Sequence, residues 1–335
     1  MIEISVRGQW IKVHGFEFAD STIITTGNWL RTAKVHDEAW SENEIQDPAS
    51  CIYRLRSQRP RADIFTFTQK PSGTEPKYSY YREDDSIAVV RLSTFDEWWM
   101  SVPQETRKNA RRSAKYGVRI EIRELDDALV NDLVQLNNSQ EIRQGRRYTH
   151  HGKSFEQVKK DHSSFVDRSD FICAYFENEL VGFVKLVYRG EVASILNLLT
   201  NESHNDKRPS NALLKAVVER CVSEGMTHLT YGNFNYGNKR NIPITTFKIR
   251  HGFQEVLVPR YFVPLTRRGS LALALGLHRG LLGILPNRLL LLGVAARAKV
   301  YSFNQWFISR CSSIAERPNR NRQTGRSNPP AGSNT

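Results

Sequence analysis

The sequence predicts a mixed α/β protein whose central sheet is largely antiparallel and flanked by helices. Three observations support this fold class. Short runs of alternating or continuous apolar residues recur along the chain at strand length, and tight turns join several of them. Longer stretches repeat apolar residues at helical spacing and separate the strand-like runs. The 335 residues are enough for two domains, or for one large domain with additions.

The first part of the chain, residues 1–95, is predicted to be a β-rich N-terminal region. IEISV, WIKV, DIFTFTQ and SIAVVRL alternate or run apolar over short stretches, which is typical of strands. KPSGTEPK, which lies before the last of these runs, has the composition of a loop.

A short cationic helix is predicted within SVPQETRKNARRSAKYGVRIEI, residues 101–122. Ser101 is a good N-cap, and Gly117 is a natural residue just after a helix C-terminus. Ala110 and Ala114 lie four residues apart and would form a narrow buried stripe, with arginines and lysines on both flanks. Cations packed this densely repel one another, so the helix is either a solvated face or a surface that binds an anion. Nucleic acid, a membrane and a small phosphorylated substrate are the candidate anions.

The main domain is predicted over residues 96–265. After the cationic helix come the strand VRIEIREL, a helix from about Asp126 to Asn137, and a polar segment, SQEIRQGRRYTHHGKS, with the features of an active-site loop. FICAYF, ELVGFVKLVYR and EVASILNLLT then form an antiparallel meander, because the turns ENE and RGE between them are short. A helix beginning near Ser210, the strand THLTYG, a short helix near TTFKIR and the strand GFQEVLVPRYFVPL complete the domain. The inner face of the helix near Ser210 is predicted from its spacing to be Leu214, Val217, Val218 and Cys221.

Composition restricts the class of partner and the compartment. The formal net charge of +13 favours an anionic partner or surface. The four cysteines lie far apart with no CxxC pair, which fits a reducing cytoplasm, and no secretory signal or membrane-spanning run is predicted. Residues 266–315 have the pattern of an apolar helical extension, and residues 316–335 that of a disordered basic tail. The stretch 270–307 would either contact a membrane surface or pack on the main domain or in a dimer interface.

The order of elements after the cationic helix resembles that of the GNAT acetyltransferase superfamily. HNDKRPSNALLKAVVERCVSEGMTHLTYG resembles the family's donor-binding segment, and NIPITTFKIRHGF resembles its closing helix and final strand. The cationic helix RKNARRSAKYGV, which follows an aromatic segment, resembles the Fem-type branch, the peptidoglycan interpeptide-bridge aminoacyltransferases and their relatives. The resemblance covers about residues 95–265 and implies an acetyltransferase-like (GNAT) fold.

The same resemblance implies a donor site at the start of the helix near Ser210, where backbone amides would hold the pyrophosphate of coenzyme A. The family's glycine-rich turn is absent there, although glycine allows the closest backbone approach to a phosphate. Acyl-coenzyme A is one donor that the resemblance implies, and aminoacyl-tRNA, which Fem-type relatives use, is the other. The predicted donor-binding residues are Lys207, Arg208, Ser210, Asn211, Ala212 and Asn241, the last of which matches the family's asparagine.

Three residues are candidate catalytic groups. Tyr231 and Tyr236 flank GNFN after a predicted strand end, where ligands gather in α/β sheets, although Tyr231 is equally compatible with the core. Lys248 stands where the family often has the tyrosine that protonates the leaving thiolate, and its alternative is an ordinary exposed lysine. The adjacent His150 and His151 lack metal-binding spacing, so no metal is predicted.

The acceptor is predicted to meet arginines, because the planar guanidinium can bond two oxygens of a phosphate at once. We expect the arginines of the cationic helix to lie beside the same cleft as Tyr231 and Tyr236. The alternative is that they pair with acidic neighbours on an exposed face, and that the polar loop is merely solvated. The predicted acceptor-binding residues are Arg107, Arg111, Arg112, Glu141, Arg143 and Asn233.

These observations favour a cytoplasmic acyltransferase that moves an acyl or aminoacyl group from an activated donor to an amine. From the resemblance alone, the acceptor would be an amino sugar or a phosphorylated cell-envelope precursor. A nucleic-acid-binding protein would explain the charge but not the order of elements. A membrane-surface protein would explain only the stretch 270–307. Under these readings the partners are the small acceptor, tRNA, the inner surface of the membrane, or a second copy of the chain.

Overall fold

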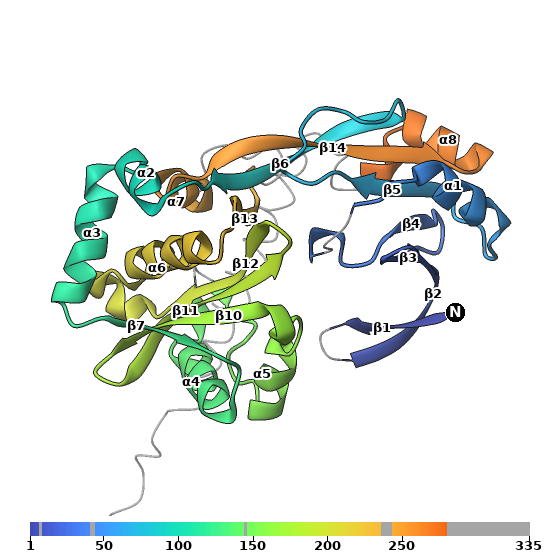
Figure 1. Cartoon of the computed structure of the whole chain (residues 1–335). Helices are drawn as coiled ribbons and strands as arrows, with labels where there is room; N and C mark the ends of the chain where they lie inside the picture. Colours follow the sequence, from blue (N-terminus) through green and yellow to red (C-terminus); the bar gives the residue numbers. More distant parts are fainter. Residues whose placement is uncertain (7–8, 41–43, 144–145, 236–242, 280–335) are drawn as a thin grey trace, which may run out of the picture. The chain divides into compact units, whose positions relative to one another are not determined.

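The computed structural model describes residues 1–6, 9–40, 44–143, 146–235 and 243–279 (Figure 1). Within these ranges a twelve-stranded sheet has the order β1-β2-β3-β4-β5-β14-β6-β13-β12-β11-β10-β7. Its strands are β1 (Ile2–Val6), β2 (Gln9–Phe18), β3 (Ser21–Thr26), β4 (Thr32–Val35), β5 (Ile64–Thr68), β6 (Tyr81–Arg91), β7 (Arg119–Arg123), β10 (Ser169–Phe176), β11 (Glu179–Arg189), β12 (Val192–Thr200), β13 (His228–Asn233) and β14 (Gln254–Pro264).

Helices and one small hairpin complete the described part of the chain. The hairpin pairs β8 (Ile142–Arg143) with β9 (Arg146–Arg147). The α-helices are α1 (Pro48–Ser57), α2 (Phe95–Ser101), α3 (Gln104–Lys115), α4 (Asp127–Asn138), α5 (Phe155–His162), α6 (Pro209–Ser223), α7 (Pro243–Arg250) and α8 (Arg267–Ala274). Short 3-10 turns are η1 (Glu38–Trp40), η2 (Val166–Arg168), η3 (Glu202–Lys207) and η4 (Leu277–Arg279). In the described ranges no helix is long and apolar enough to cross a membrane.

Most strand pairs of the sheet are antiparallel, which confirms the predicted fold class. The exceptions among the described pairs are β4 with β5 and β12 with β13, which run parallel. β14 pairs with β5 on one side and β6 on the other, so residues before 95 and residues after 250 share one sheet. The predicted meander is also confirmed, because β11 pairs antiparallel with both β10 and β12.

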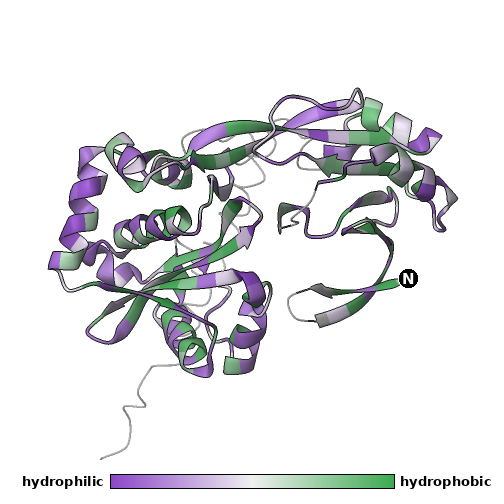
Figure 2. Cartoon of the chain, in the orientation of Figure 1, coloured by the Kyte–Doolittle hydropathy of each residue, from purple (hydrophilic) through white to green (hydrophobic). Residues whose placement is uncertain are grey.

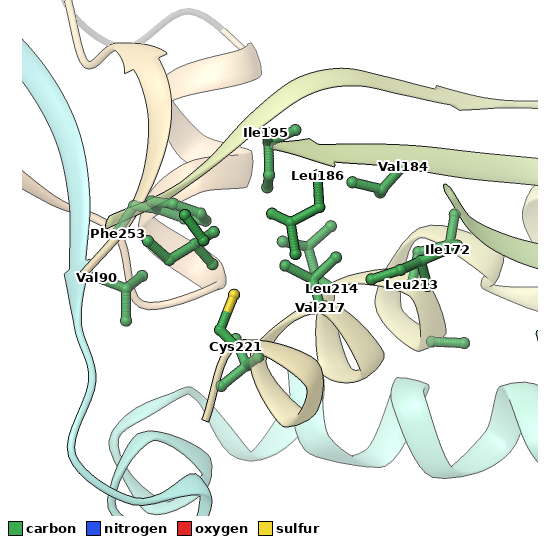
Figure 3. Packing of buried hydrophobic residues seen from close by; sticks show 14 of the residues in the cluster. Val90, Ile172, Val184, Leu186, Ile195, Leu213, Leu214, Val217, Cys221 and Phe253 are labelled. Atoms are coloured by element: carbon green, nitrogen blue, oxygen red, sulfur yellow. The ribbon is translucent and has the colours of Figure 1, made fainter. Parts of the chain in front are cut away.

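The helix α6 packs on one face of this meander, and α4 and α5 pack on the other (Figure 1). Leu214, Val217 and Cys221 of α6 are buried against Leu186 of β11, as the helical spacing predicted (Figure 3). On the opposite face, α4 and α5 cover the aromatic side chains of β10 and β11. The meander is therefore buried on both sides, and its long apolar runs follow from that position.

The cationic helix α3 lies against α6 and is largely hydrophilic along its length (Figure 2). Its buried side is Thr106, Ala110 and Ser113, whereas Ala114 is exposed, so the predicted alanine stripe was wrong at its second member. The predicted N-cap was also wrong. Ser101 is the last residue of α2, because that helix already begins after Thr94, whose hydroxyl accepts a hydrogen bond from the Glu97 amide at 3.2 Å.

Candidate functional site

The strands β12 and β13 separate partway along their length. They pair only from Val192 to Ser194, opposite His228 to Thr230. Beyond this point β12 has no strand partner on its β13 side in the described residues, while it stays paired with β11 on the other. A bulge lies at the same place, since Lys185 pairs with Asn197 and Leu186 with Ile195. The bulge bends β12 where β13 departs, and half of its amides and carbonyls then face the gap.

A cleft of about 680 Å³ occupies this gap. One wall is the unpaired half of β12, and the opposite wall is formed by Tyr231 of β13 with the start of α7. The helix α6 contributes only Ser210, at its N-terminal end. Side chains of the β8–β9 hairpin and of the segment after it close a further side. The residues from these last elements and from α4 and α5 are Asn137, Arg143, Arg147, Tyr148, Thr149, His150 and His162.

Two cations border the cleft, and each has an acidic partner. Arg143 Nε lies 3.5 Å from a Glu202 carboxylate oxygen, and Arg147 Nε lies 3.7 Å from Glu141. Both arginines are accessible to solvent, so these ion pairs are weak and can be exchanged for a ligand. Arg143 also stacks above the Tyr148 ring, 5.6 Å from its centroid, which keeps the guanidinium at the edge of the cleft.

A buried histidine from α5 faces the cleft. His162 is 6% exposed and packs edge-on against Phe171 and Phe183, and its Nδ1 has no hydrogen-bond partner among the described atoms. Burial, followed by the charge of Lys185, lowers the pKa of His162 to about 4. The imidazole is therefore neutral at physiological pH. Lys185 fixes the end of α5 by donating a hydrogen bond to the His162 carbonyl at 2.7 Å.

The predicted catalytic residues are only partly brought together. Tyr231 lines the cleft. Lys248 lies behind it: the side chain is fully buried, and its ammonium donates to the Asn233 carbonyl at 2.6 Å, 4.6 Å from the centroid of the Tyr231 ring. Burial lowers the pKa of Lys248 to about 8. The alternative of an ordinary exposed lysine is thus wrong, and the hydrogen bond of Lys248 connects α7 to β13. Tyr236 lies outside the described residues.

The predicted donor residues are dispersed around the start of α6. Lys207 lies over the Tyr116 and Phe176 rings, at 5.8 and 5.2 Å from their centroids. Asn211 Nδ2 lies 3.2 Å from His251 Nε2, and Ala212 is buried in the core. Arg208 is exposed in the left-handed backbone region at φ 58°. Asn241 lies outside the described residues, so Ser210 is the described member of the predicted donor set that lines the cleft.

Among the predicted acceptor residues, Arg143 lines the cleft and the others do not. Arg111 lines a different groove between α3, β7 and α6 and lies 5.6 Å from the centroid of the Trp99 ring. Arg107 Nη1 contacts the Met100 sulfur at 3.0 Å. The expectation that the α3 arginines border the cleft was therefore wrong, because α3 packs on α6 and not on the open edge of β12. The remaining predicted residues also lie away from the cleft: Arg112 on α3, the exposed Glu141, and Asn233, which lines a second cavity.

Sequence reasoning missed Arg147, Tyr148, His162 and the unpaired half of β12. One signal was available. Ser154 and Gln157 form a capping box at the start of α5, and its S-x-x-Q spacing would have predicted the helix that carries His162. The separation of β12 from β13 has no local signature, because it depends on strands far apart in the sequence.

Comparison with known proteins is consistent with this geometry. Residues 101–240 match the family described as acetyltransferase (GNAT) domain. No curated protein matches the sequence. Among solved structures, FemX is similar with a TM-score of 0.54 and 9% identity, covering 81% of this chain and 89% of that one. L-PGS from Bacillus licheniformis is similar with a TM-score of 0.50 and 14% identity, covering 77% and 84%.

At these identities the two structures show a shared fold. The matched residues 101–240 include α3, the meander, α6 and β13, and so contain both strands that open the cleft. Residues 101–240 of this chain therefore form an acetyltransferase (GNAT) domain, set in a larger fold that the chain shares with FemX.

Proposed function

We propose that the protein transfers an acyl or aminoacyl group from an activated donor to an amine held in the cleft between β12 and β13. The observation that carries this proposal is the edge of β12 from Asn197 to Thr200, next to the bulge, which has no strand partner on its β13 side within the described ranges. Its free N–H groups are fixed in direction by the pairing with β11. An amide in this position can donate a hydrogen bond to the acyl oxygen as negative charge develops on it.

Positioning supplies the rest of the chemistry. The acceptor amine attacks the acyl carbon, the C–N bond forms, the bond to the leaving group breaks, and the amine proton leaves with that group or through water. His162 is suited to orient the amine, because it lines the cleft with a ring that is neutral at physiological pH. Holding both reactants in one cleft removes most of the entropic cost of their meeting.

The start of α6 fits the pyrophosphate of coenzyme A poorly. Pro209 has no N–H, and the amides of Asn211 and Ala212 both donate to the Arg208 carbonyl, at 3.1 and 3.4 Å. A helix N-terminus binds an anion through free amides, and few remain here. Of the two donors that the sequence resemblance implies, we therefore propose aminoacyl-tRNA.

The charge of the molecule supports this choice. The chain carries a formal net charge of +13, and Arg143 and Arg147 border the cleft with weak, solvent-exposed acidic partners. Such guanidiniums can exchange a carboxylate for a phosphate of the tRNA end. Binding of this kind weakens steeply as salt rises, because each phosphate contact releases counterions. For the acceptor we propose an amine on an amino sugar or cell-envelope precursor, which rests on the sequence resemblance.

A donor competition assay tests the proposal. The purified protein is incubated with aminoacyl-tRNA or acetyl-coenzyme A and a panel of amines, and acylated amines are detected by mass spectrometry. We expect transfer from aminoacyl-tRNA that falls with salt and is lost on removing the aminoacyl group. Transfer from acetyl-coenzyme A alone would contradict the donor, and transfer from neither would contradict the activity.

A further inference from the structure

A second cavity, of about 210 Å³, lies next to the cleft along β12 and β13. On β12, Ser194 lines this cavity and Asn197 lines the cleft. On β13, Thr230 lines the cavity and its neighbour Tyr231 lines the cleft. Residues of β5, β6 and β14 and of the loop before α1 form its other walls. Since a water molecule occupies about 30 Å³ of liquid, the cavity has room for a small molecule and not only for solvent.

Arg189, at the end of β11, lines this cavity with an uncompensated charge. It is 8% exposed, and its Nε is buried without a hydrogen-bond partner. Its guanidinium makes no hydrogen bond or ion pair within the ranges that the structure describes. Burial, with Arg168 second, lowers the pKa of Arg189 to about 10, so the group stays charged at neutral pH. A buried charge without a partner is costly, and an anion in the cavity would remove that cost.

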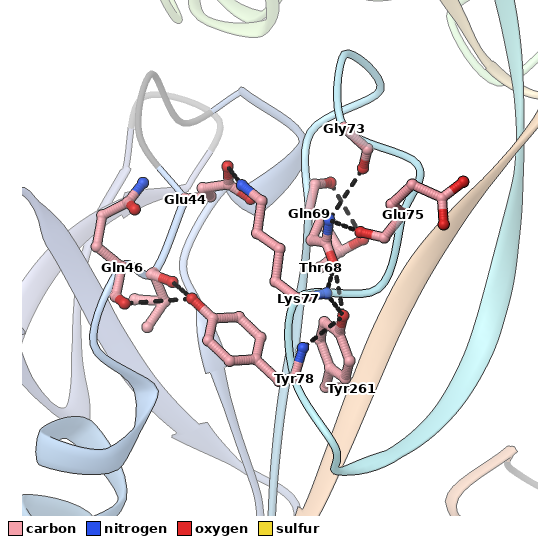
Figure 4. A network of polar contacts seen from close by, with 10 residues as sticks. Glu44, Gln46, Thr68, Gln69, Gly73, Glu75, Lys77, Tyr78 and Tyr261 are labelled. Atoms are coloured by element: carbon pink, nitrogen blue, oxygen red, sulfur yellow. Dashed lines mark hydrogen bonds and ion pairs between the residues drawn. The ribbon is translucent and has the colours of Figure 1, made fainter.

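The carboxylates that also line the cavity are already engaged by other cations. Arg260 donates to Asp85 at 2.7 Å and to Glu38 at 2.8 Å. Glu44 accepts from Lys77 at 2.6 Å, in a polar network that includes Gln69 (Figure 4). None of them contributes to the pKa of Arg189. These carboxylates are therefore already paired, and within the described ranges none of them is a partner of Arg189.

Two hydroxyl groups complete the polar lining. Ser194 Oγ and Thr230 Oγ1 are buried and lie 2.6 Å apart. When Ser194 is the donor of this pair, the hydrogen of Thr230 is left with a long contact of 3.5 Å to the Ala193 carbonyl. This hydroxyl is thus available to a better acceptor in the cavity.

We infer that this cavity is a binding site for a small monocarboxylate, which pairs with the Arg189 guanidinium and accepts a hydrogen bond from the Ser194–Thr230 hydroxyl pair. A single negative charge matches the single free guanidinium. A phosphate dianion matches less well, because three carboxylates share the same walls. The site is separate from the acyl-transfer cleft, and the inference does not depend on the proposed function.

Ligand binding can be measured without turnover. Thermal unfolding and calorimetric titration are carried out with sodium acetate and butyrate, with acetamide as the neutral isostere and with inorganic phosphate, at constant ionic strength. We compare the wild-type chain with Arg189→Met, and use Arg56→Met, an exposed arginine on α1, as the matched control. We expect saturable stabilisation by the monocarboxylates, unchanged in Arg56→Met and weakened about tenfold or more in Arg189→Met.

A second readout does not require the ligand. Without carboxylate, Arg189→Met should unfold at the same temperature as the wild type or higher, because the substitution removes an unpaired buried charge. Equal acetate effects in wild type and Arg189→Met, or no saturable effect in the wild type, would overturn the site. Stabilisation by phosphate in place of carboxylate would overturn the assignment of its ligand. If Arg189→Met fails to fold, Ser194→Ala is tested in its place, and we expect a smaller loss of acetate affinity. Equal acetate effects in the wild type and in Ser194→Ala would then overturn the site.

Discussion

Two cationic regions of the molecule, α3 and the β8–β9 hairpin, differ in a way that locates the site. The helix α3 carries Arg107, Arg111 and Arg112 on a largely hydrophilic surface, yet none of them lines the cleft (Figure 2). The hairpin is as rich in arginine for its length, and there Arg143 and Arg147 border the cleft directly. Position relative to the separating strands, and not the density of charge along the sequence, therefore determines which cations can meet a substrate.

The largest effect is expected from reversing the hairpin charges. Arg143→Glu with Arg147→Glu would place two carboxylates at the cleft, next to Glu202 and Glu141, which now pair with these arginines. We expect the transfer efficiency with aminoacyl-tRNA to fall by about a hundredfold, because two charge-assisted contacts are replaced by repulsion. The matched control is Arg56→Glu with Arg61→Glu, two exposed arginines far along the sequence from the hairpin. Equal losses of transfer efficiency in the two double variants would show a general effect of net charge. They would contradict a specific role of the hairpin.

The lowered pKa of His162, in the cleft, predicts how the free energy of unfolding changes with pH. Its pKa is about 4 in the folded protein, against an ordinary value of about 6.5, so below neutrality the unfolded chain binds more protons than the folded one. Its contribution is therefore present above pH 6.5 and is lost as the pH falls toward 4. Between pH 7 and pH 5 we expect a loss of about 2 kcal/mol from this group. His162→Asn should reduce the acid sensitivity of unfolding, whereas His14→Asn, at an exposed position, should leave it unchanged.

The architecture of the main domain was predictable from sequence because its signals are local. Short turns set the meander, and helical spacing set the inner face of α6. The sequence did not reveal α5 or β3, whose apolar patterns are short. The site was less predictable. Arg143, Ser210 and Tyr231 were predicted site residues and line the cleft, but the cleft itself depends on where β13 leaves β12. The domain boundaries inferred from composition stay predictions.

A smaller effect is expected from the charges of Lys207 and Arg208, in the turn before α6. Lys207 lies over two aromatic rings and Arg208 is exposed, and neither borders the cleft. Reversing both to Glu should change the donor's dissociation constant by less than about threefold, as expected for exposed charges. Fluorescence titration with aminoacyl-tRNA measures this directly. A loss as large as that of the hairpin variant would restore the start of α6 as the donor site.

The smallest effect is expected on α3 itself. Arg111→Lys keeps the charge but removes the planar fork, which matters only if the guanidinium grips a phosphate. Because Arg111 lies beside Trp99 and away from the cleft, we expect a change of less than about twofold in the acceptor's Michaelis constant. A larger increase in the Michaelis constant, with altered salt dependence, would show that α3 does bind the acceptor.

The location of the bound donor tests the central claim most directly. Hydrogen–deuterium exchange is measured on the full chain with and without a non-hydrolysable aminoacyl-tRNA, and uncharged tRNA serves as the reference. The cleft account predicts that the aminoacyl group adds protection at Asn197–Thr200 of β12 and at the β8–β9 hairpin, and adds none at Gln104–Lys115 of α3. Protection that the aminoacyl group adds on α3, with β12 unchanged, would contradict it.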